Sequence, residues 1–404
     1  MFFVYISLFI LMFDLSLTPY ASELIFSIVP VPLGYRTLFI FLSILCLLAW
    51  LIIFTPKRVF SDLWNVAKYW IPWIVYLAVR TNITDNGLWK LEMYLVKVFL
   101  PCMILAAMYI ANKTLFEKYF MNTFLSVNIV MLVYLFLFHR ISGETANFDR
   151  NIWLARSLGI CIFYYIISFR FSKRAFFIVP VIVLFAVAML IIGSRGPVLS
   201  LLLAMTTFFC LKFRKNIGAL AISFTISFII ILFFVYLPSF SKAFKAFSTH
   251  GKSEKVIQAV QGRTNIYVPT LKIFINHPIV GVGFAGWWDA YRNRFLQKKS
   301  WFANSFKSRG LRDYTYPHNI FLEILSELGV VGFIFFSMLF RPYRRVFNSN
   351  MAFNYLILLG FFYALSSSDI AQNAAPMIFN ILSVTYATVY SVNERPAKNN
   401  ILAH

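Results

Sequence analysis

The chain has 404 residues, of which 60% are hydrophobic, 19% aromatic and only 13% charged. A water-soluble domain of this length would lack the polar side chains to cover its surface, so the composition indicates a membrane protein. Lys and Arg number 37 against 15 Asp and Glu, a net charge of +22, but they fall in short clusters between apolar runs. This pattern excludes a nucleic-acid-binding arm and favours anionic lipid, phosphate or diphosphate as the partner.

Apolar runs of about 20 residues, the length that crosses a bilayer, recur along almost the whole chain. They predict an all-α integral membrane protein with about twelve transmembrane helices, near residues 2–19, 33–54, 62–80, 93–112, 120–138, 152–169, 176–194, 197–211, 217–237, 319–340, 353–367 and 374–391. The first run lacks a basic leading region and contains Asp14, so we expect a retained first span and no cleaved signal peptide.

The basic residues are distributed unequally between alternate connections. If the N-terminus is cytoplasmic, the inside connections hold fifteen basic residues, whereas the short outside connections hold or border six, Lys90 among them. Cytoplasmic loops carry the excess of Lys and Arg in membrane proteins. We therefore expect both termini to face the cytoplasm.

One long connection, residues 238–318, separates helices 1–9 (residues 1–237) from helices 10–12 and a cytoplasmic tail (residues 319–404) within one integral unit. Its thirteen basic and three acidic residues give it a net charge of +10. A loop of this length normally has a function, and its position predicts a loop on the outer side of the membrane. Residues 267–274 are apolar at helical spacing, and we expect short interfacial helices with Trp287, Trp288, Trp301 and Phe302 at the lipid headgroups.

The sequence offers no metal or disulfide pattern. The four cysteines, at 46, 102, 161 and 210, all lie inside apolar runs, without a CxxC spacing. The acidic residues of the long loop, Glu254, Asp289 and Asp313, are isolated, whereas a diphosphate-bound Mg²⁺ would require one or two protein carboxylates. We expect no metal and no cofactor, and arginines would then have to bind a diphosphate.

Two arginines occupy positions suited to an anion. Arg195 lies at the outer junction of two predicted spans, where Gly196 and Pro197 reverse the chain, and its planar fork suits a phosphate. Arg263 opens the helical stretch of the long loop, where free backbone N–H groups could face the same anion. The simpler alternative for Arg195 is a side chain that reaches the lipid headgroups.

Charged residues within apolar runs are further candidates for substrate binding. Arg156 and Lys97 lie inside predicted spans, where a charge costs about 3 kcal/mol or more and is rarely kept without a partner or a water-filled cavity. The alternative is a structural pair with a carboxylate such as Glu92 or Asp149. Arg312, one of the basic residues of the long loop, is also a candidate.

His318 stands at the outer mouth of the tenth predicted span, just after Pro317. Asn319, Glu323 and Glu327 follow four residues apart on one helical stripe that enters the membrane, so we expect them to contact substrate or to be paired. An imidazole at this mouth can take a proton from a sugar hydroxyl near neutral pH. The alternative is a histidine that only caps the helix.

Four short motifs occur in a fixed order: SRGPVLSL (194–201), GRTNIY (262–267), NHPIVGVGFAG (276–286) and YPHNIFLEILSELGVVG (316–332). With the basic loop between them, they resemble the O-antigen ligase and O-antigen polymerase superfamily over about residues 140–340. Residues 1–139 agree with that superfamily only in hydropathy.

The resemblance implies a multi-pass enzyme of the bacterial inner membrane. Such an enzyme transfers a glycan from undecaprenyl diphosphate to a sugar hydroxyl on the periplasmic face, without metal or nucleotide. It also implies that Arg195 and Arg263 bind the diphosphate and that His318 activates or positions the acceptor. The acceptor is lipid A-core in a ligase and a second lipid-linked glycan in a polymerase. The basic, tryptophan-bearing loop leads us to favour the ligase.

Two other classes stay open on the residues alone. A transporter of lipid-linked sugars would also have many spans and interior cations, but it typically shows two related halves, and we find no internal repeat. A scaffold without catalysis would not need two glutamates beneath a histidine.

Overall fold

The computed structural model describes residues 57–138, 148–168, 175–192, 195–212, 266–293, 317–342, 352–366 and 374–390, together with the single residues 218, 225 and 370. These residues are helical apart from short turns, and within them no strand occurs. The all-α prediction is therefore confirmed for this part of the chain. The predicted spans at 2–19 and 33–54, and nearly all of 217–237, lie outside the described residues.

The helices follow the predicted runs closely. Their bounds are α4 Lys57–Ala67, α5 Ile71–Arg80, α6 Asp85–Tyr94, η2 Leu95–Phe99, α7 Leu100–Ala111, α8 Lys113–Phe138, α9 Phe148–Ile167, α10 Ala175–Ile192, α11 Arg195–Lys212, an unlabelled helix Ile266–Asn276, α14 Trp287–Tyr291, α16 Ile320–Met338, α17 Ala352–Ser366, α18 Ala374–Thr385 and η6 Tyr386–Tyr390.

Prolines explain two local departures from the predicted helices. The expected span 62–80 is divided into α4 and α5, because Pro72 in the first turn of α5 has no N–H to donate to the carbonyl four residues before it. The expected span 93–112 instead begins at residue 85 and runs on through α7. Pro101 cannot donate a helical hydrogen bond, and the π-helical turn η2 lies directly before it.

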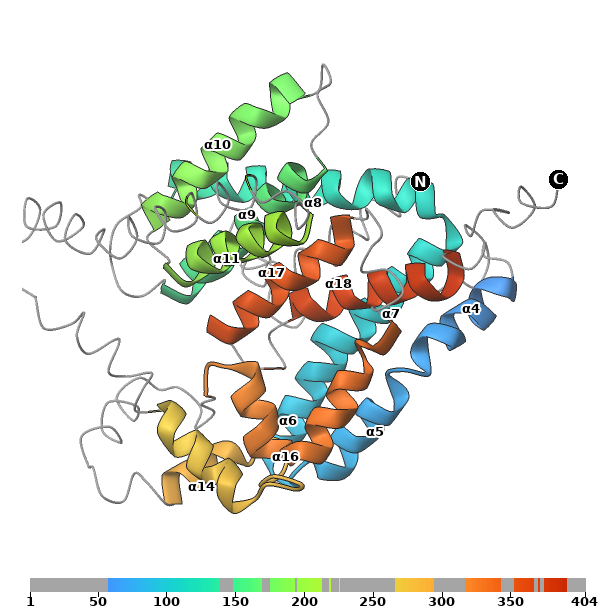
Figure 1. Cartoon of the computed structure of the whole chain (residues 1–404), viewed down its shortest axis with the longest axis vertical. Helices are drawn as coiled ribbons and strands as arrows, with labels where there is room; N and C mark the ends of the chain where they lie inside the picture. The colour runs from blue at the N-terminus through green and yellow to red at the C-terminus, as the bar shows by residue number, and fades with distance from the viewer. Residues whose placement is uncertain are drawn as a thin grey trace, which may run out of the picture.

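The helices form two groups, with α17 and α18 between them (Figure 1). The helices α5, α6 and α16 lie together at one end, with α14 beside α16, and α8 to α11 lie at the other end. A single large cluster of buried apolar side chains runs from α4 to η6, and Cys102 and Cys161 are buried within it as expected. By length and composition, Asn86–Ala111 and Ile320–Met338 are long and apolar enough to cross a membrane among the described helices.

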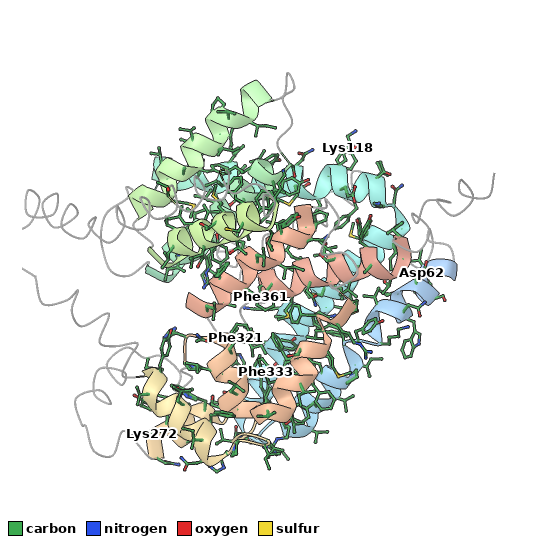
Figure 2. The ribbon with its side chains drawn as sticks, in the orientation of Figure 1. Asp62, Lys118, Lys272, Phe321, Phe333 and Phe361 are labelled. Atoms are coloured by element: carbon green, nitrogen blue, oxygen red, sulfur yellow. The ribbon has the colours of Figure 1, made fainter. Side chains whose placement is uncertain are left out.

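The helix α16 is broken at Gly329, which corrects the prediction of an uninterrupted helix over 319–340. Gly329 has φ 66° and ψ −167°, a conformation that a residue with a side chain rarely adopts. Figure 1 shows the two arms of α16, residues 320–328 and 330–338, meeting at one end. Figure 2 labels Phe321 and Phe333, one from each arm, and Phe361 of α17. The Phe321 ring centre is 6.3 Å from that of Phe333 and 5.9 Å from that of Phe361.

The backbone groups freed by this break are satisfied by the loop that follows the helix 266–276. The N–H groups of Val282 and Gly283 donate to the carbonyls of Ser326 and Glu327, at 3.0 and 2.8 Å. In return, the N–H groups of Val330 and Val331 donate to the carbonyls of Pro278 and Ile279, at 2.8 and 3.1 Å. A helix can be broken in an apolar environment only where such partners replace the lost bonds.

We predict that Gly329→Ala destabilises the protein. A residue with a side chain in this conformation, which is essentially restricted to glycine, costs about 1–3 kcal/mol, and a Cβ at this position would also lie 2.3 Å from the Ile279 carbonyl oxygen. The measurement is the temperature at which half of the monodisperse protein in detergent is lost. Ile334→Ala, on an exposed site of the second arm, is the matched control. Equal stability of the two variants would contradict the broken helix.

Candidate functional site

His318 directly precedes α16 and has φ 56°, a left-handed conformation that is uncommon for a residue other than glycine. Asn319 then caps the first arm: its side-chain oxygen accepts hydrogen bonds from the N–H groups of Phe321 and Leu322, at 3.0 and 3.2 Å. Its amide donates to the Leu365 carbonyl at 3.4 Å. The cap and the neighbouring buried Pro317 therefore fix the backbone on which the half-buried imidazole is carried.

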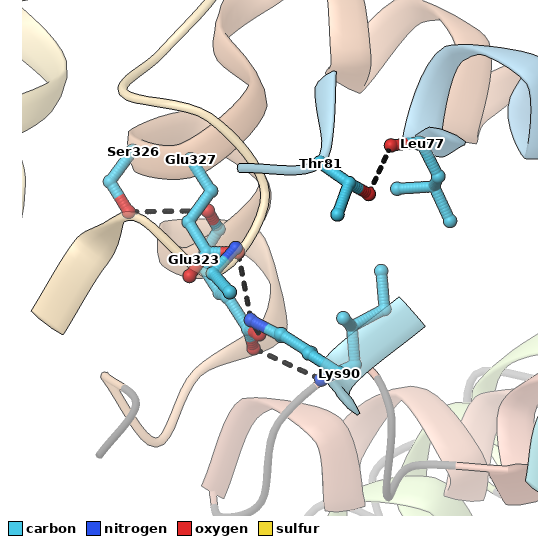
Figure 3. Close-up of polar contacts among 8 residues, drawn as sticks. Leu77, Thr81, Lys90, Glu323, Ser326 and Glu327 are labelled. Carbon is cyan, nitrogen blue, oxygen red and sulfur yellow. Dashed lines mark hydrogen bonds and ion pairs between the residues drawn. The ribbon is translucent and has the colours of Figure 1, made fainter. Parts of the chain in front are cut away.

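The two glutamates of the first arm meet a lysine from another helix. The Lys90 ammonium, on α6, lies 2.5 Å from Glu323 Oε1 and 2.8 Å from Glu327 Oε2 (Figure 3). All three side chains are almost completely buried, with at most 3% of their surface exposed. Two carboxylates one helical turn apart would repel each other in an apolar interior, and the lysine between them removes that cost.

The backbone supplies further donors to the same carboxylates. Glu327 Oε2 accepts from the Ala285 N–H at 3.0 Å, and Glu323 Oε2 accepts from the Ile370 N–H at 3.0 Å. The Lys90 ammonium also lies 4.7 Å from the centre of the Phe284 ring. The formal charges of one lysine and two glutamates sum to −1, and these donors stabilise the carboxylate oxygens. We name Lys90, Glu323 and Glu327 the ionic cluster.

The loop at residues 277–286 reaches the cluster because it is also held by the connection between α5 and α6. The Phe284 N–H donates to the Arg80 carbonyl at 2.7 Å, and the Asn82 N–H donates to the Phe284 carbonyl at 3.3 Å. The Arg80 guanidinium in turn donates to the carbonyls of Val280 and Gly281, at 3.0 and 3.2 Å. This loop carries most of the motif NHPIVGVGFAG, and its hydrogen bonds connect the ends of α5, α6 and α16. We name residues 277–286 the strap loop.

The predicted helix at 267–274 is confirmed as the helix Ile266–Asn276, but its tryptophan neighbours differ from expectation. Trp287 and Trp288, expected at the lipid headgroups, are buried to 1% and 8% exposure against Ile273 and Tyr291. The Trp287 indole N–H donates to the Thr270 hydroxyl at 3.0 Å, so the ring is an internal anchor of the helix. Burial also raises the pKa of the Tyr291 hydroxyl above its usual value of 10.0. Trp301 and Phe302 lie outside the described residues.

Arg156 is buried in α9 against the end of α17. Its guanidinium donates to the Tyr363 carbonyl at 3.1 Å and lies 4.9 Å from the Trp153 ring centre and 5.5 Å from that of Tyr363. The Tyr363 hydroxyl donates back to the Arg156 carbonyl at 3.1 Å. Gly159 makes this pairing possible, because a Cβ there would lie 2.1 Å from the Tyr363 hydroxyl oxygen.

The other predicted site residues are only partly described. Arg195 is the first residue of α11, but its side chain lies outside the described part. Lys97 is half-buried on η2. Arg263 and Arg312 lie outside the described residues. The structure thus brings together His318, Asn319, Glu323 and Glu327 on one arm, and it places Arg156 against α17, the helix whose Leu365 carbonyl bonds Asn319.

The sequence analysis missed the role of Lys90, which it counted among the basic residues of the outside connections. The signal that could have found it was the glutamate pair itself, since two carboxylates in an apolar helix require a buried cation. Within the described ranges, no three His, Cys, Asp or Glu side chains gather in the manner of a metal site.

Residues 180–337 match the family model described as O-antigen ligase. The match includes most of α10, all of α11, the strap loop, His318 and nearly all of α16. The resemblance drawn from the motifs is therefore confirmed for this segment, which is similar to the O-antigen ligase family. The family is membrane-embedded, and the match supports an O-antigen ligase-like or polymerase-like function. No curated protein matches the chain.

We predict that Lys90→Met strongly reduces the yield of folded protein, because removal of one partner from a buried ion pair typically costs about 3–5 kcal/mol. The triple variant Lys90→Met, Glu323→Gln, Glu327→Gln should recover most of the yield, since neutral amide oxygens still accept from Ala285 and Ile370. The measurement is the monodisperse fraction after extraction in detergent.

The control for this prediction is Lys272→Met, which changes an exposed lysine of the helix 266–276. Its yield should match that of the wild type. If Lys90→Met and Lys272→Met gave the same folded yield, the buried ionic cluster would be incorrect.

Proposed function

We propose that the protein transfers a glycan from undecaprenyl diphosphate to a sugar hydroxyl, with lipid A-core as the acceptor, as in an O-antigen ligase. The observation that carries the proposal is the family match over residues 180–337, which includes Arg195, Arg263 and His318 in one segment. The match assigns the class, whereas the donor, the acceptor and the residue roles belong to the proposal.

The proposed reaction is a single displacement at carbon-1 of the first donor sugar. The acceptor oxygen forms a bond to carbon-1 while the bond from carbon-1 to the diphosphate oxygen breaks, and undecaprenyl diphosphate leaves with the bonding electrons. His318 accepts the proton of the acceptor hydroxyl. The cations Arg195 and Arg263 stabilise the charge that develops on the diphosphate. Inversion at carbon-1 follows from attack opposite the leaving group.

Hydrogen bonding around the ionic cluster disfavours a metal held by its two glutamates. Both oxygens of Glu323 are engaged, one by Lys90 and the other by the Ile370 N–H, and Glu327 Oε2 holds Lys90 and the Ala285 N–H. A divalent metal at this stripe would have to displace Lys90 and a backbone donor. We therefore propose that arginine side chains, with no metal and no cofactor, bind the diphosphate.

Further substrate contacts are proposed around this centre. Lys97 and Arg312 would add positive charge toward the diphosphate or the acceptor, and Asn319 would lie near the acceptor. Glu323 and Glu327, on the same arm as Asn319, and Arg156, against α17, would support this centre from inside the protein. The cap geometry of Asn319 supports a role close to the acceptor, because it determines where His318 stands.

We place the protein in the bacterial inner membrane, with about twelve spans, both termini in the cytoplasm and residues 238–318 in the periplasm. The charge distribution between alternate connections supports this orientation. The reaction would then occur on the periplasmic face, where membrane lipids surround the donor.

The main alternative to the ligase is a polymerase that joins two lipid-linked glycans. Both enzymes would use the same donor and the same chemistry, and they differ in the acceptor. The net charge of +10 on residues 238–318 supports the ligase, since it suits a phosphate-rich core as well as the donor diphosphate. A transporter of lipid-linked sugars is a further alternative, which would form no glycosidic bond.

We predict that His318→Ala abolishes transfer by purified protein supplied with lipid-linked donor and acceptor, because loss of a general base typically costs about 10²–10⁴-fold. Arg195→Lys should also be severely impaired, since lysine offers a point charge in place of a fork. His277→Ala, at an exposed histidine of the strap loop, is the control and should be active.

The same assay is repeated with excess chelator, and full activity is expected. Wild-type rates in well-folded His318→Ala protein would refute the role of His318 as the general base. Loss of activity that added Mg²⁺ restores would refute the metal-independent mechanism. A protein that moves donor across vesicles without forming a glycosidic bond would support the transporter.

Deletion of the gene distinguishes the two acceptors. For a ligase we expect lipopolysaccharide without any attached glycan on a gel, with long polymer retained on undecaprenyl diphosphate. Core that carries a single repeat unit would instead identify a polymerase. Complementation with the wild-type gene is the control.

A further inference from the structure

The last turn of α17 receives hydrogen bonds from three other segments. The Ser200 hydroxyl, on α11, donates to the Phe362 carbonyl at 3.0 Å. The Arg156 guanidinium, on α9, donates to the Tyr363 carbonyl at 3.1 Å, and the Asn319 amide donates to the Leu365 carbonyl at 3.4 Å. The final carbonyls of a helix lack partners within it, so this turn is a natural attachment point.

Two of these attachments lead directly to residues of the proposed chemistry. Ser200 stands five residues after Arg195 on α11, a rise of about 7.5 Å along a helix. Asn319 is the residue after His318. The α17 turn is therefore the shared support of the helix that begins with Arg195 and of the arm that follows His318.

Arg156 is the strongest of the three attachments on physical grounds. It is 3% exposed, its charge faces the negative end of the α17 dipole, and the reciprocal bond from the Tyr363 hydroxyl holds its own backbone. Hydrogen bonds from a charged donor in a buried position are stronger than neutral ones. Loss of this donor would loosen the turn to which α11 and the first arm of α16 are both attached.

We infer that Arg156 is a positioning residue, which sets the spacing between the Arg195 helix and the His318 arm through the last turn of α17. This inference rests on the proposed function for the roles of Arg195 and His318. It revises the expectation that Arg156 binds substrate, because its guanidinium is engaged inside the protein by Tyr363. The spacing matters because reacting groups that are misplaced by about 1 Å can lose about 10²-fold in rate.

Single-turnover kinetics with lipid-linked donor distinguish positioning from binding. Arg156→Met should lower the rate at saturating donor by roughly ten- to a hundredfold, with little change in the donor concentration at half-maximal rate. Arg156→Lys retains a donor for the Tyr363 carbonyl and should recover much of the rate. Ser200→Ala, a milder change at the same turn, should show a smaller effect of the same kind. Arg341→Met, at an exposed arginine, should behave like the wild type.

A distance measurement tests the same inference without any activity. Spin labels are placed at Leu199, an exposed position on α11, and at Leu325, a half-buried position on the first arm of α16, in full-length protein whose four native cysteines are replaced. Arg156→Met should broaden or shift the distance distribution between the labels, whereas Arg156→Lys and Arg341→Met should leave it unchanged.

Each outcome decides the inference. A raised half-saturating donor concentration with an unchanged maximal rate would make Arg156 a donor-binding residue and overturn it. An unchanged distance distribution in Arg156→Met would also overturn it. Wild-type protein that transfers no glycan would refute the proposed function, while the distance measurement would still test whether Arg156 fixes the spacing.

Discussion

The arrangement around the candidate site depends on the electrostatic cost of Glu323 and Glu327, which lie one turn apart in a buried helix. Neither carboxylate can remain charged in that position without a cation and further donors. Lys90 supplies the cation from α6, and the backbones of Ala285 and Ile370 supply the donors. Four segments that are distant in sequence are thus drawn to one place, directly beneath the residue pair His318–Asn319.

The break at Gly329 is coupled to the same place. The strap loop bonds to both sides of the break, and its residue Ala285 also bonds to Glu327. The loop therefore satisfies the backbone of α16 and the ionic cluster at once, and each contact supports the other. A continuous α16 would have no free backbone groups at residues 326 to 331 to receive the loop.

Helix positions could be predicted from the sequence, because apolar runs and their prolines act locally. The runs at 353–367 and 374–391, for example, became α17 and α18 with η6. The break in α16 could not be predicted in this way. The sequence LSELGVVG resembles that of a continuous apolar helix, and a single glycine is tolerated in many helices. Its cause is a partner loop about 50 residues earlier in the chain.

The polar residues of the candidate site could be predicted from the sequence, but most of the groups that bond to them could not. The stripe Asn319, Glu323 and Glu327 under His318 could be recognised from four-residue spacing alone. Lys90 and the Tyr363 carbonyl could not, because tertiary contacts selected them from among many lysines and carbonyls. Placing Trp287 and Trp288 at the headgroups failed for the same reason: tryptophan suits both a membrane surface and a buried anchor, and only packing against Ile273 decides between them.

These contacts separate two kinds of polar residue along the first arm of α16. Toward its middle, the glutamate oxygens bond Lys90 and backbone N–H groups, so a direct contact with substrate there would have to break bonds inside a buried, charged cluster. At its start, Asn319 uses its oxygen as the helix cap and its amide on α17, while His318 stands one residue further out in a half-buried position. If the arm acts in glycan transfer, proton transfer therefore belongs at His318, and the glutamates act by holding the arm in place. This division explains why charged residues occur in a buried position where they are costly.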